Sequence, residues 1–292
     1  MQTLVQFDMA AWQAAVSEAD RERAIQSLES GRVLYFPRLA FDLEPAERAL
    51  VERAEAPSAR KNITFDPSTG RAHGSELADE DARIIARLLD RFGATVEAWF
   101  DALFPAYVGG VERARATFRP AEIAGREYSP RKDDRRLHVD AFPSRPTGGR
   151  RILRVFCNIN PFGEPRVWNV GEPFAEFAAR ILPRTRRQWP LEREVLALTG
   201  ITKSPRGAYD HAMLELHDRA KLDSAYQSSA PHERIDFPPG STWLCFTDQV
   251  LHAALSGRGM LEQTLLVDAA RLVAPERAPQ RVLERLAGRA LG

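Results

Sequence analysis

The fold is decided by one stretch, residues 136–160, which reads RLHVDAFPSRPTGGRRILRVFCNIN. Its first part places His138 and Asp140 two residues apart, so on extended backbone their side chains point to the same side. A turn rich in proline and glycine follows at 143–149. Residues 151–159 are then apolar and alternating, which is typical of a strand. The stretch therefore predicts two metal-ligating side chains on an extended segment, joined by a turn to a strand.

The rest of the chain has helical patterns first and strand patterns later. We expect strands at 111–123, 151–159, 242–247 and 260–267, and helices at 9–30, 44–56, 79–103 and 275–290. Helical patterns return between about 171 and 228. Such an order favours an α+β fold with a double-stranded β-helix (jelly-roll, cupin-like) core over about 111–267. The N-terminal helices, a helical insertion at 171–228 and a C-terminal helix would decorate it, as one domain over residues 1–292.

The composition limits the class of protein. The 292 residues carry a net charge of +1, so nucleic acid is not an expected partner. The two cysteines, Cys157 and Cys245, lie in apolar runs and are expected to be buried free thiols of a reducing compartment. The N-terminus has no secretory pattern, and no stretch is apolar enough to span a membrane. We therefore expect a cytoplasmic protein, which its arginines could bring to the cytoplasmic face of the inner membrane.

A second histidine completes a candidate metal site. His252 follows the predicted strand at 242–247, and neighbouring strands of a jelly roll can bring it to His138 and Asp140. Two histidines and one carboxylate with three open positions form the ligand set of non-haem Fe(II) oxygenases. A zinc protease would instead carry His-Glu-x-x-His, which is absent. The alternative is that His138 is a strand-end histidine that hydrogen-bonds Asp140.

The motifs around these ligands resemble a known family. The run from His138 to His252 resembles the Fe(II)/2-oxoglutarate-dependent dioxygenase superfamily. The segments RLHVDAFPSRPT (136–147), RILRVFCNINP (151–161), AEIAGR (121–126) and YDHAMLELHD (209–218) resemble, more specifically, the Kdo hydroxylases of Gram-negative bacteria. The resemblance covers most of the chain.

The resemblance implies a reaction and its participants. The substrate would be Kdo, the sugar acid 3-deoxy-manno-octulosonic acid, in Kdo–lipid A of the lipopolysaccharide inner core, hydroxylated at C3. The cofactors would be Fe(II), with 2-oxoglutarate and O₂ as cosubstrates and ascorbate as a reductant. Succinate and CO₂ would be released. The family's ligand positions fall on His138, Asp140 and His252.

The basic residue that would hold the far carboxylate of 2-oxoglutarate is ambiguous. Many members of the superfamily place it nine to eleven residues after the second histidine, where this chain has Leu261, Glu262 and Gln263. We prefer Arg154, which shares a strand face with Asn158, and Asn158 could assist by hydrogen bonding. Arg258 is the second candidate, and the remaining alternative is that Arg154 pairs with a protein carboxylate.

The acceptor is anionic, so arginines near the triplet are candidate substrate contacts. Arg126 and Arg145 are the preferred ones, within a basic region that precedes and follows His138 and Asp140. Such a region suits an anionic glycolipid at a membrane surface, although it would also make an ordinary solvated face. His211 and His217 are six residues apart and do not share a helix face, so a second metal site is not expected.

Three functions remain in competition. The first is hydroxylation of Kdo–lipid A. The second is the same chemistry on a small metabolite or a protein side chain. The third is a cupin-like protein that binds a sugar acid or a metal without turnover. The three open positions argue against the third, because a binding module has no need of an open iron site.

Overall fold

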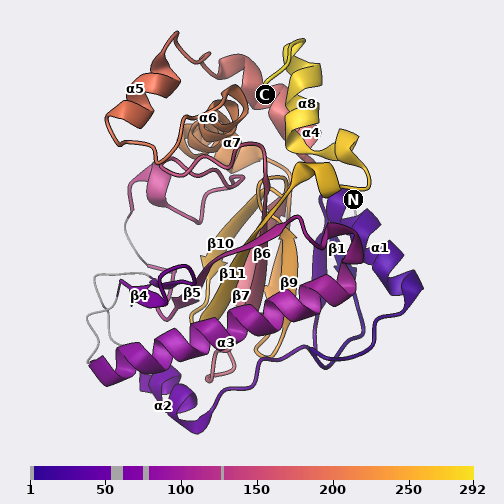
Figure 1. Ribbon diagram of the computed structural model, residues 1–292, viewed down its shortest axis with the longest axis vertical. Helices are drawn as coiled ribbons and strands as arrows, with labels where there is room; N and C mark the ends of the chain where they lie inside the picture. The colour runs from indigo at the N-terminus through magenta and orange to yellow at the C-terminus, as the bar shows by residue number, and fades with distance from the viewer. Residues whose placement is uncertain (1–2, 54–61, 75–78, 126–127) are drawn as a thin grey trace.

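Two β-sheets face each other in the computed structural model, which describes residues 3–53, 62–74, 79–125 and 128–292 (Figure 1). The larger sheet contains, in spatial order, β1 (Leu4–Gln6), β2 (Val33–Phe36), β9 (Thr242–Phe246), β6 (Arg151–Asn158), β11 (Met260–Val267), β5 (Val111–Arg119), β3 (Ile63–Asp66) and β4 (Arg71–His73). The smaller sheet contains β10 (His252–Ser256), β7 (Arg166–Gly171) and β8 (His232–Phe237). All pairs are antiparallel except β1 with β2. The architecture is the expected α+β jelly roll.

The central strand β6 separates two cores. Leu153 and Val155 belong to the core on the outer face of the large sheet. Phe156 belongs to the core between the two sheets, where it contacts Trp168 and Trp243 with ring centroids 4.9 and 5.4 Å apart. Because strand side chains alternate, Arg154 points the same way as Phe156, into the space between the sheets. The alternation of β6 thus decides which polar residues reach the interior.

Helices cover the outer face of the large sheet and one end of the sandwich (Figure 1). The long helix α3 (Asp79–Leu103) lays an apolar stripe that includes Leu88, Phe92 and Val96 on the large sheet. No helix in the described ranges has the length and apolar content to cross a membrane. The other helices are α1 (Glu18–Glu29), α2 (Pro45–Arg53), α4 (Phe174–Ile181), α5 (Glu192–Leu198), α6 (Ala208–Leu222), α7 (Ser224–Ser229) and α8 (Pro279–Ala287).

The insertion packs at the end of the sandwich where the metal ligands lie. Side chains of α4, α6, α7 and α8 share one apolar core with Leu137, Val139 and Leu251. These three residues are sequence neighbours of His138 and His252. The helices therefore hold the backbone of the metal-binding segments from outside.

Most predicted elements are confirmed, but several boundaries differ, since the strand predicted at 111–123 ends at Arg119 and the helix predicted at 275–290 begins at Pro279, and several strands were missed. The helix at 79–103 and the strands at 151–159, 242–247 and 260–267 lie as expected. The helix predicted over 9–30 begins only at Glu18, because the Ser17 side chain caps it by accepting from the amide of Asp20. Strands β1, β3, β4, β7, β8 and β10 were not predicted.

Candidate metal and cosubstrate site

Backbone hydrogen bonds bring the three predicted ligands together. The amide of His138 donates to the carbonyl of His252 at 3.1 Å, and the amide of His252 donates back at 2.9 Å. The amide of Asp140 donates to the carbonyl of Thr247, just beyond β9, at 2.8 Å. Residues more than a hundred positions apart in the sequence are thereby fixed side by side.

The histidine rings are oriented for metal binding. Nδ1 of His138 lies 2.7 Å from the carbonyl of Arg136, and Nδ1 of His252 lies 2.9 Å from the carbonyl of Val250. Each Nδ1 must then carry the proton, which leaves Nε2 as the lone-pair donor. The Trp168 ring stacks on His252 with centroids 5.0 Å apart and keeps that ring in place.

The ligand atoms are close enough for one ion. Nε2 of His138 lies 3.8 Å from Oδ1 of Asp140, and all three ligand atoms lie within 4.8 Å of one another. Metal bonds to nitrogen and oxygen are about 2.0–2.2 Å long, so an ion fits among them after small shifts. In the described part of the chain, this is the one such cluster of metal-binding side chains.

Electrostatics keep the ligands in metal-binding form. Burial lowers the pKa of His138, and the neighbouring His252 lowers it further. Burial also lowers the pKa of His252. For Asp140 burial acts to raise the pKa, but Arg154 and the two histidines outweigh it and hold the pKa well below its usual value. The site thus offers two neutral imidazoles and one carboxylate, which is the protonation state that a divalent cation requires.

Arg154 stands directly behind the carboxylate ligand. Its Nε lies 3.1 Å from Oδ2 of Asp140, and its Nη1 donates to Glu262 at 2.9 Å. Glu262 is also paired with Arg119 at 2.7 Å. The arginine is therefore inside the barrel as expected, but it is engaged by two protein carboxylates, which is the alternative considered for it.

A second interior arginine was not anticipated. Arg166 opens β7 and shares a strand face with Trp168 and Val170, and Val170 lies opposite His252. Arg166 is 2% exposed, donates Nη1 to the carbonyl of Gly257 at 2.7 Å, and its Nε has no hydrogen-bond partner among the described residues. Burial, with Arg119 nearby, lowers the pKa of Arg166 to about 9. No carboxylate of the described ranges forms an ion pair with this buried cation, which is unusual unless an anion binds there.

The remaining candidates bond to protein groups or lie elsewhere. Arg258 is paired with Glu164 at 3.1 Å. The side-chain amide of Asn158 donates to the carbonyls of Glu164 and Phe237, and its Oδ1 accepts from the amide of Asn160. Arg126 lies outside the described residues.

An open cleft lies next to the candidate metal site. Its volume is about 710 Å³, and it is lined by Phe142, Arg145, Arg154, Glu262 and Thr264, with Arg115 and Arg119 from β5. Among the residues that line it, Arg154 is the one that contacts Asp140. Arg145 therefore lines the same cleft as Arg154, and its role as a substrate contact stays a prediction.

Comparisons with known proteins show which family the chain resembles. A family model described as 3-deoxy-D-manno-oct-2-ulosonic acid (Kdo) hydroxylase matches residues 11–290. A crystal structure of the Kdo hydroxylase KdoO, a non-heme Fe(II) α-ketoglutarate-dependent dioxygenase in complex with α-ketoglutarate and Fe(III), is 47% identical with a TM-score of 0.95. The match covers 99% of this chain and 97% of that one. The complex of KdoO with succinate and Fe(III) is also 47% identical, with the same coverage and a TM-score of 0.94. Curated protein sequences gave no match.

Proposed function

Because the chain belongs to the Kdo hydroxylase family, we propose that it hydroxylates Kdo in an Fe(II)- and 2-oxoglutarate-dependent reaction. The observation that carries this is the buried cluster of His138, Asp140 and His252, whose ligand atoms lie within 4.8 Å of one another. One O₂ and one 2-oxoglutarate are consumed for each C–H bond that becomes C–OH. Succinate and CO₂ are the other products, so atoms and electrons balance without a further reactant. Ascorbate would only keep iron reduced.

The chain's own residues would prepare the metal for this reaction. His138 and His252 present Nε2, and Asp140 presents Oδ1, since Oδ2 faces Arg154. Bound Fe(II) would supply the adjacent open positions at which a 2-keto acid and O₂ react. Arg154 and Glu262 orient Asp140, and such outer contacts fix the direction of a ligand's lone pair. The apolar interior formed by Phe156, Trp168 and Trp243 keeps water away.

For the far carboxylate of 2-oxoglutarate we prefer Arg166 over the residues favoured by the sequence. Arg154 and Arg258 pair with protein carboxylates, and the Asn158 amide donates to two backbone carbonyls. Among the described residues, Arg166 instead donates only to the Gly257 carbonyl. Arg166 is four residues along β7 from Val170, the strand partner of His252, which is about 13 Å of strand. That separation suits an arginine side chain and the length of a five-carbon diacid laid end to end. Buried Nε1 of Trp168, which has no hydrogen-bond partner among the described residues, lies on the same face and could donate to the cosubstrate.

The acceptor is proposed to be Kdo linked to lipid A, with C3 as the carbon that is oxidised. Arg145, Arg115 and Arg119 give the cleft wall a positive charge that suits the sugar carboxylate and nearby phosphates. Arg126 stays a sequence-based proposal for the same role. An acceptor with lipid chains would bring the enzyme to the cytoplasmic face of the inner membrane.

One incubation separates the competing functions. The protein is mixed with Fe(II), ascorbate and 2-oxoglutarate, with and without Kdo–lipid A, and succinate and the lipid mass are followed. We expect succinate to rise with the acceptor and the lipid to gain one oxygen atom. If 2-oxoglutarate turns over at the same rate with and without the acceptor, another substrate is favoured. No turnover at all would favour a binding protein.

A further inference from the structure

The helical insertion exposes an unusual concentration of large apolar side chains. Trp189, Leu191, Val195, Leu198 and Ile201, which we call the α5 patch, are 69%, 71%, 54%, 90% and 58% exposed. They are five of the ten exposed large hydrophobic residues found in the described part of the chain, and they lie within thirteen positions. Scattered exposed leucines are ordinary, but a contiguous apolar patch on a soluble protein usually marks a contact surface.

An ion pair and hydrogen bonds fix the backbone that carries the α5 patch. Arg186 forms two bonds to Glu192, at 2.6 and 2.7 Å, and the amide of Trp189 donates to the same carboxylate at 2.9 Å. The Arg186 guanidinium also lies 5.0 Å from the centre of the Trp189 ring. Thr202, just beyond the patch, is buried and anchors the segment. The apolar side chains are thus presented by ordered structure.

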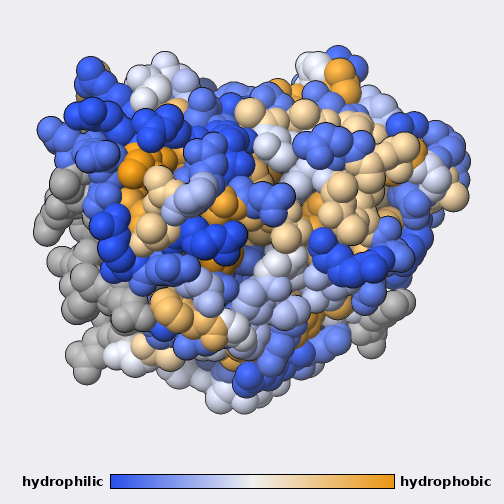
Figure 2. Space-filling view, turned by 90° about the horizontal axis from the view of Figure 1, so that it is seen from below, coloured by the Kyte–Doolittle hydropathy of each residue, from blue (hydrophilic) through white to orange (hydrophobic). Residues whose placement is uncertain are grey.

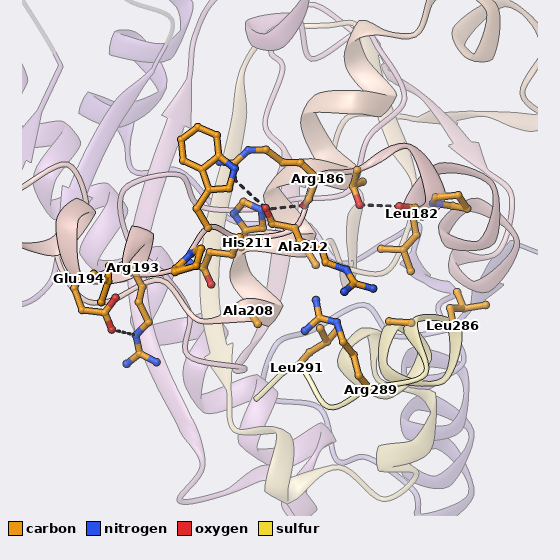
Figure 3. A pocket seen from close by; sticks show the side chains of 18 residues that line it. Leu182, Arg186, Arg193, Glu194, Ala208, His211, Ala212, Leu286, Arg289 and Leu291 are labelled. Carbon is orange, nitrogen blue, oxygen red and sulfur yellow. Dashed lines mark hydrogen bonds and ion pairs between the residues drawn. The ribbon is translucent and has the colours of Figure 1, made fainter.

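An open groove runs beside the patch (Figure 3). Its volume is about 710 Å³, and apolar side chains of α4–α5, α6 and α8, among them Leu182, Leu286 and Leu291, line it. Arg187 and Arg289 stand on its wall and form no ion pair within the described residues. Apolar side chains beside unpaired cations suit an amphipathic ligand with a negative head group.

The patch adjoins the mouth of the active-site cleft. The amide of Lys203 donates to the carbonyl of Ser144 at 2.8 Å, and the Arg206 guanidinium donates to the carbonyl of Pro143. Pro143, Ser144 and Arg145 all line that cleft. A surface that covered the α5 patch would therefore also lie next to the cleft entrance. Figure 2 shows the molecule from below, where hydrophilic side chains surround apolar areas.

We propose that the α5 patch docks the protein on an anionic phospholipid bilayer. Residues 182–206 contain six arginines and lysines against two glutamates, so the charge complements lipid phosphates. Trp189 and the leucines enter the boundary between head groups and acyl chains, where aromatic and aliphatic side chains are favoured. A second copy of the chain is a poorer occupant, because two such positive surfaces repel each other. The proposal deepens the proposed function, since it places the cleft entrance at the surface that holds a glycolipid acceptor.

The test uses the full chain and vesicles. We expect it to sediment with vesicles of phosphatidylglycerol and phosphatidylethanolamine much more than with phosphatidylcholine vesicles, and Trp189 fluorescence to shift to shorter wavelength. The double variant Leu191→Ser/Leu198→Ser should lose binding by at least about tenfold, because it removes two inserting side chains. The matched control Val273→Ser, at a residue 63% exposed outside the patch, should bind as the wild type does.

Two results would overturn the proposal. The first is a double variant that binds vesicles as well as the wild type. The second is a wild-type dimer in solution that the double variant splits while vesicle binding persists, because the occupant would then be a second copy. Turnover on a soluble Kdo oligosaccharide is measured alongside and should be unchanged in both variants. Loss of vesicle binding with intact turnover separates this proposal from the proposed reaction.

Discussion

The Nε of Arg154 lies 3.1 Å from Oδ2 of Asp140, the oxygen that does not face His138. The arginine therefore contacts Oδ2 of the carboxylate, and Oδ1 is left to bind a metal. Its Nη1 is held in turn by Glu262 at 2.9 Å. We therefore expect Arg154, which the sequence suggested as the cosubstrate clamp, to position Asp140 for metal binding.

Replacing this arginine should weaken metal binding. Arg154→Met leaves Asp140 free to rotate and Glu262 without one partner, and loss of an outer contact typically lowers metal affinity by about 10- to 100-fold. Fe(II) or Co(II) affinity, measured by calorimetry without oxygen, checks this. Arg115→Met, which alters a cleft arginine paired with Asp66, is the control and should keep its affinity. Equal metal affinity in Arg154→Met and wild type would refute the positioning role.

Arg166→Met should raise the KM for 2-oxoglutarate. A hydrogen bond to a charged group contributes about 1.5–3 kcal/mol, which corresponds to roughly 10- to 150-fold. Arg258→Met should change that KM by less than about threefold, because Arg258 pairs with Glu164 on the rim. Thermal unfolding confirms that the variants fold. If Arg258→Met or Arg154→Met has the larger effect on KM, the clamp belongs to that residue instead.

Arg145→Ala should raise the KM for the acceptor and leave the KM for the cosubstrate unchanged. Its guanidinium lines the cleft outside the metal-ligand network, so we expect a rise of about 5- to 10-fold in the KM for Kdo–lipid A. The KM for 2-oxoglutarate should stay the same. Steady-state kinetics with each substrate varied in turn provide both values. A change confined to the KM for 2-oxoglutarate would show that Arg145 does not contact the acceptor.

Breaking the interior ion pair of Arg151 and Asp248 should lower the free energy of unfolding. The two form bonds of 2.8 and 3.0 Å, both are buried, and the Arg151 guanidinium lies 3.9 Å from the Phe246 ring centre. Asp248→Asn leaves a buried cation without its charge partner and should cost about 3–5 kcal/mol of unfolding free energy. Asp236→Asn, in an exposed pair with Arg234, should cost less than about 1 kcal/mol. Urea unfolding compares them, and similar midpoints would contradict the prediction.

The metal ligands and the main strands could be predicted from the sequence because their signals are local. His138 and Asp140 lie two apart on extended backbone, and β6, β9 and β11 are long apolar runs between turn residues. The α3 stripe repeats over seven turns, which fixes that helix without tertiary information. The residue types of the triad indicated iron, and the family resemblance then supplied the cosubstrate and the acceptor.

The smaller sheet and the interior arginines could not be predicted in the same way. Strand β8 reads His-Glu-Arg-Ile-Asp-Phe, which has few apolar residues, and its pairing with β7 is set by tertiary contacts. Whether Arg154 or Arg166 is free for a ligand depends on which carboxylates reach it. Glu262 comes from β11, more than a hundred residues after Arg154, so that pairing has no local signal. The one available hint for Arg166 was an arginine opening a strand that continues with Val-Trp.

The most direct test of the account is turnover of Kdo–lipid A under ¹⁸O₂. We expect one ¹⁸O atom in the hydroxyl group at C3 of Kdo and one in succinate, and neither product with His138→Ala. Unlabelled succinate, or acceptor that gains no oxygen while 2-oxoglutarate is consumed, would contradict it.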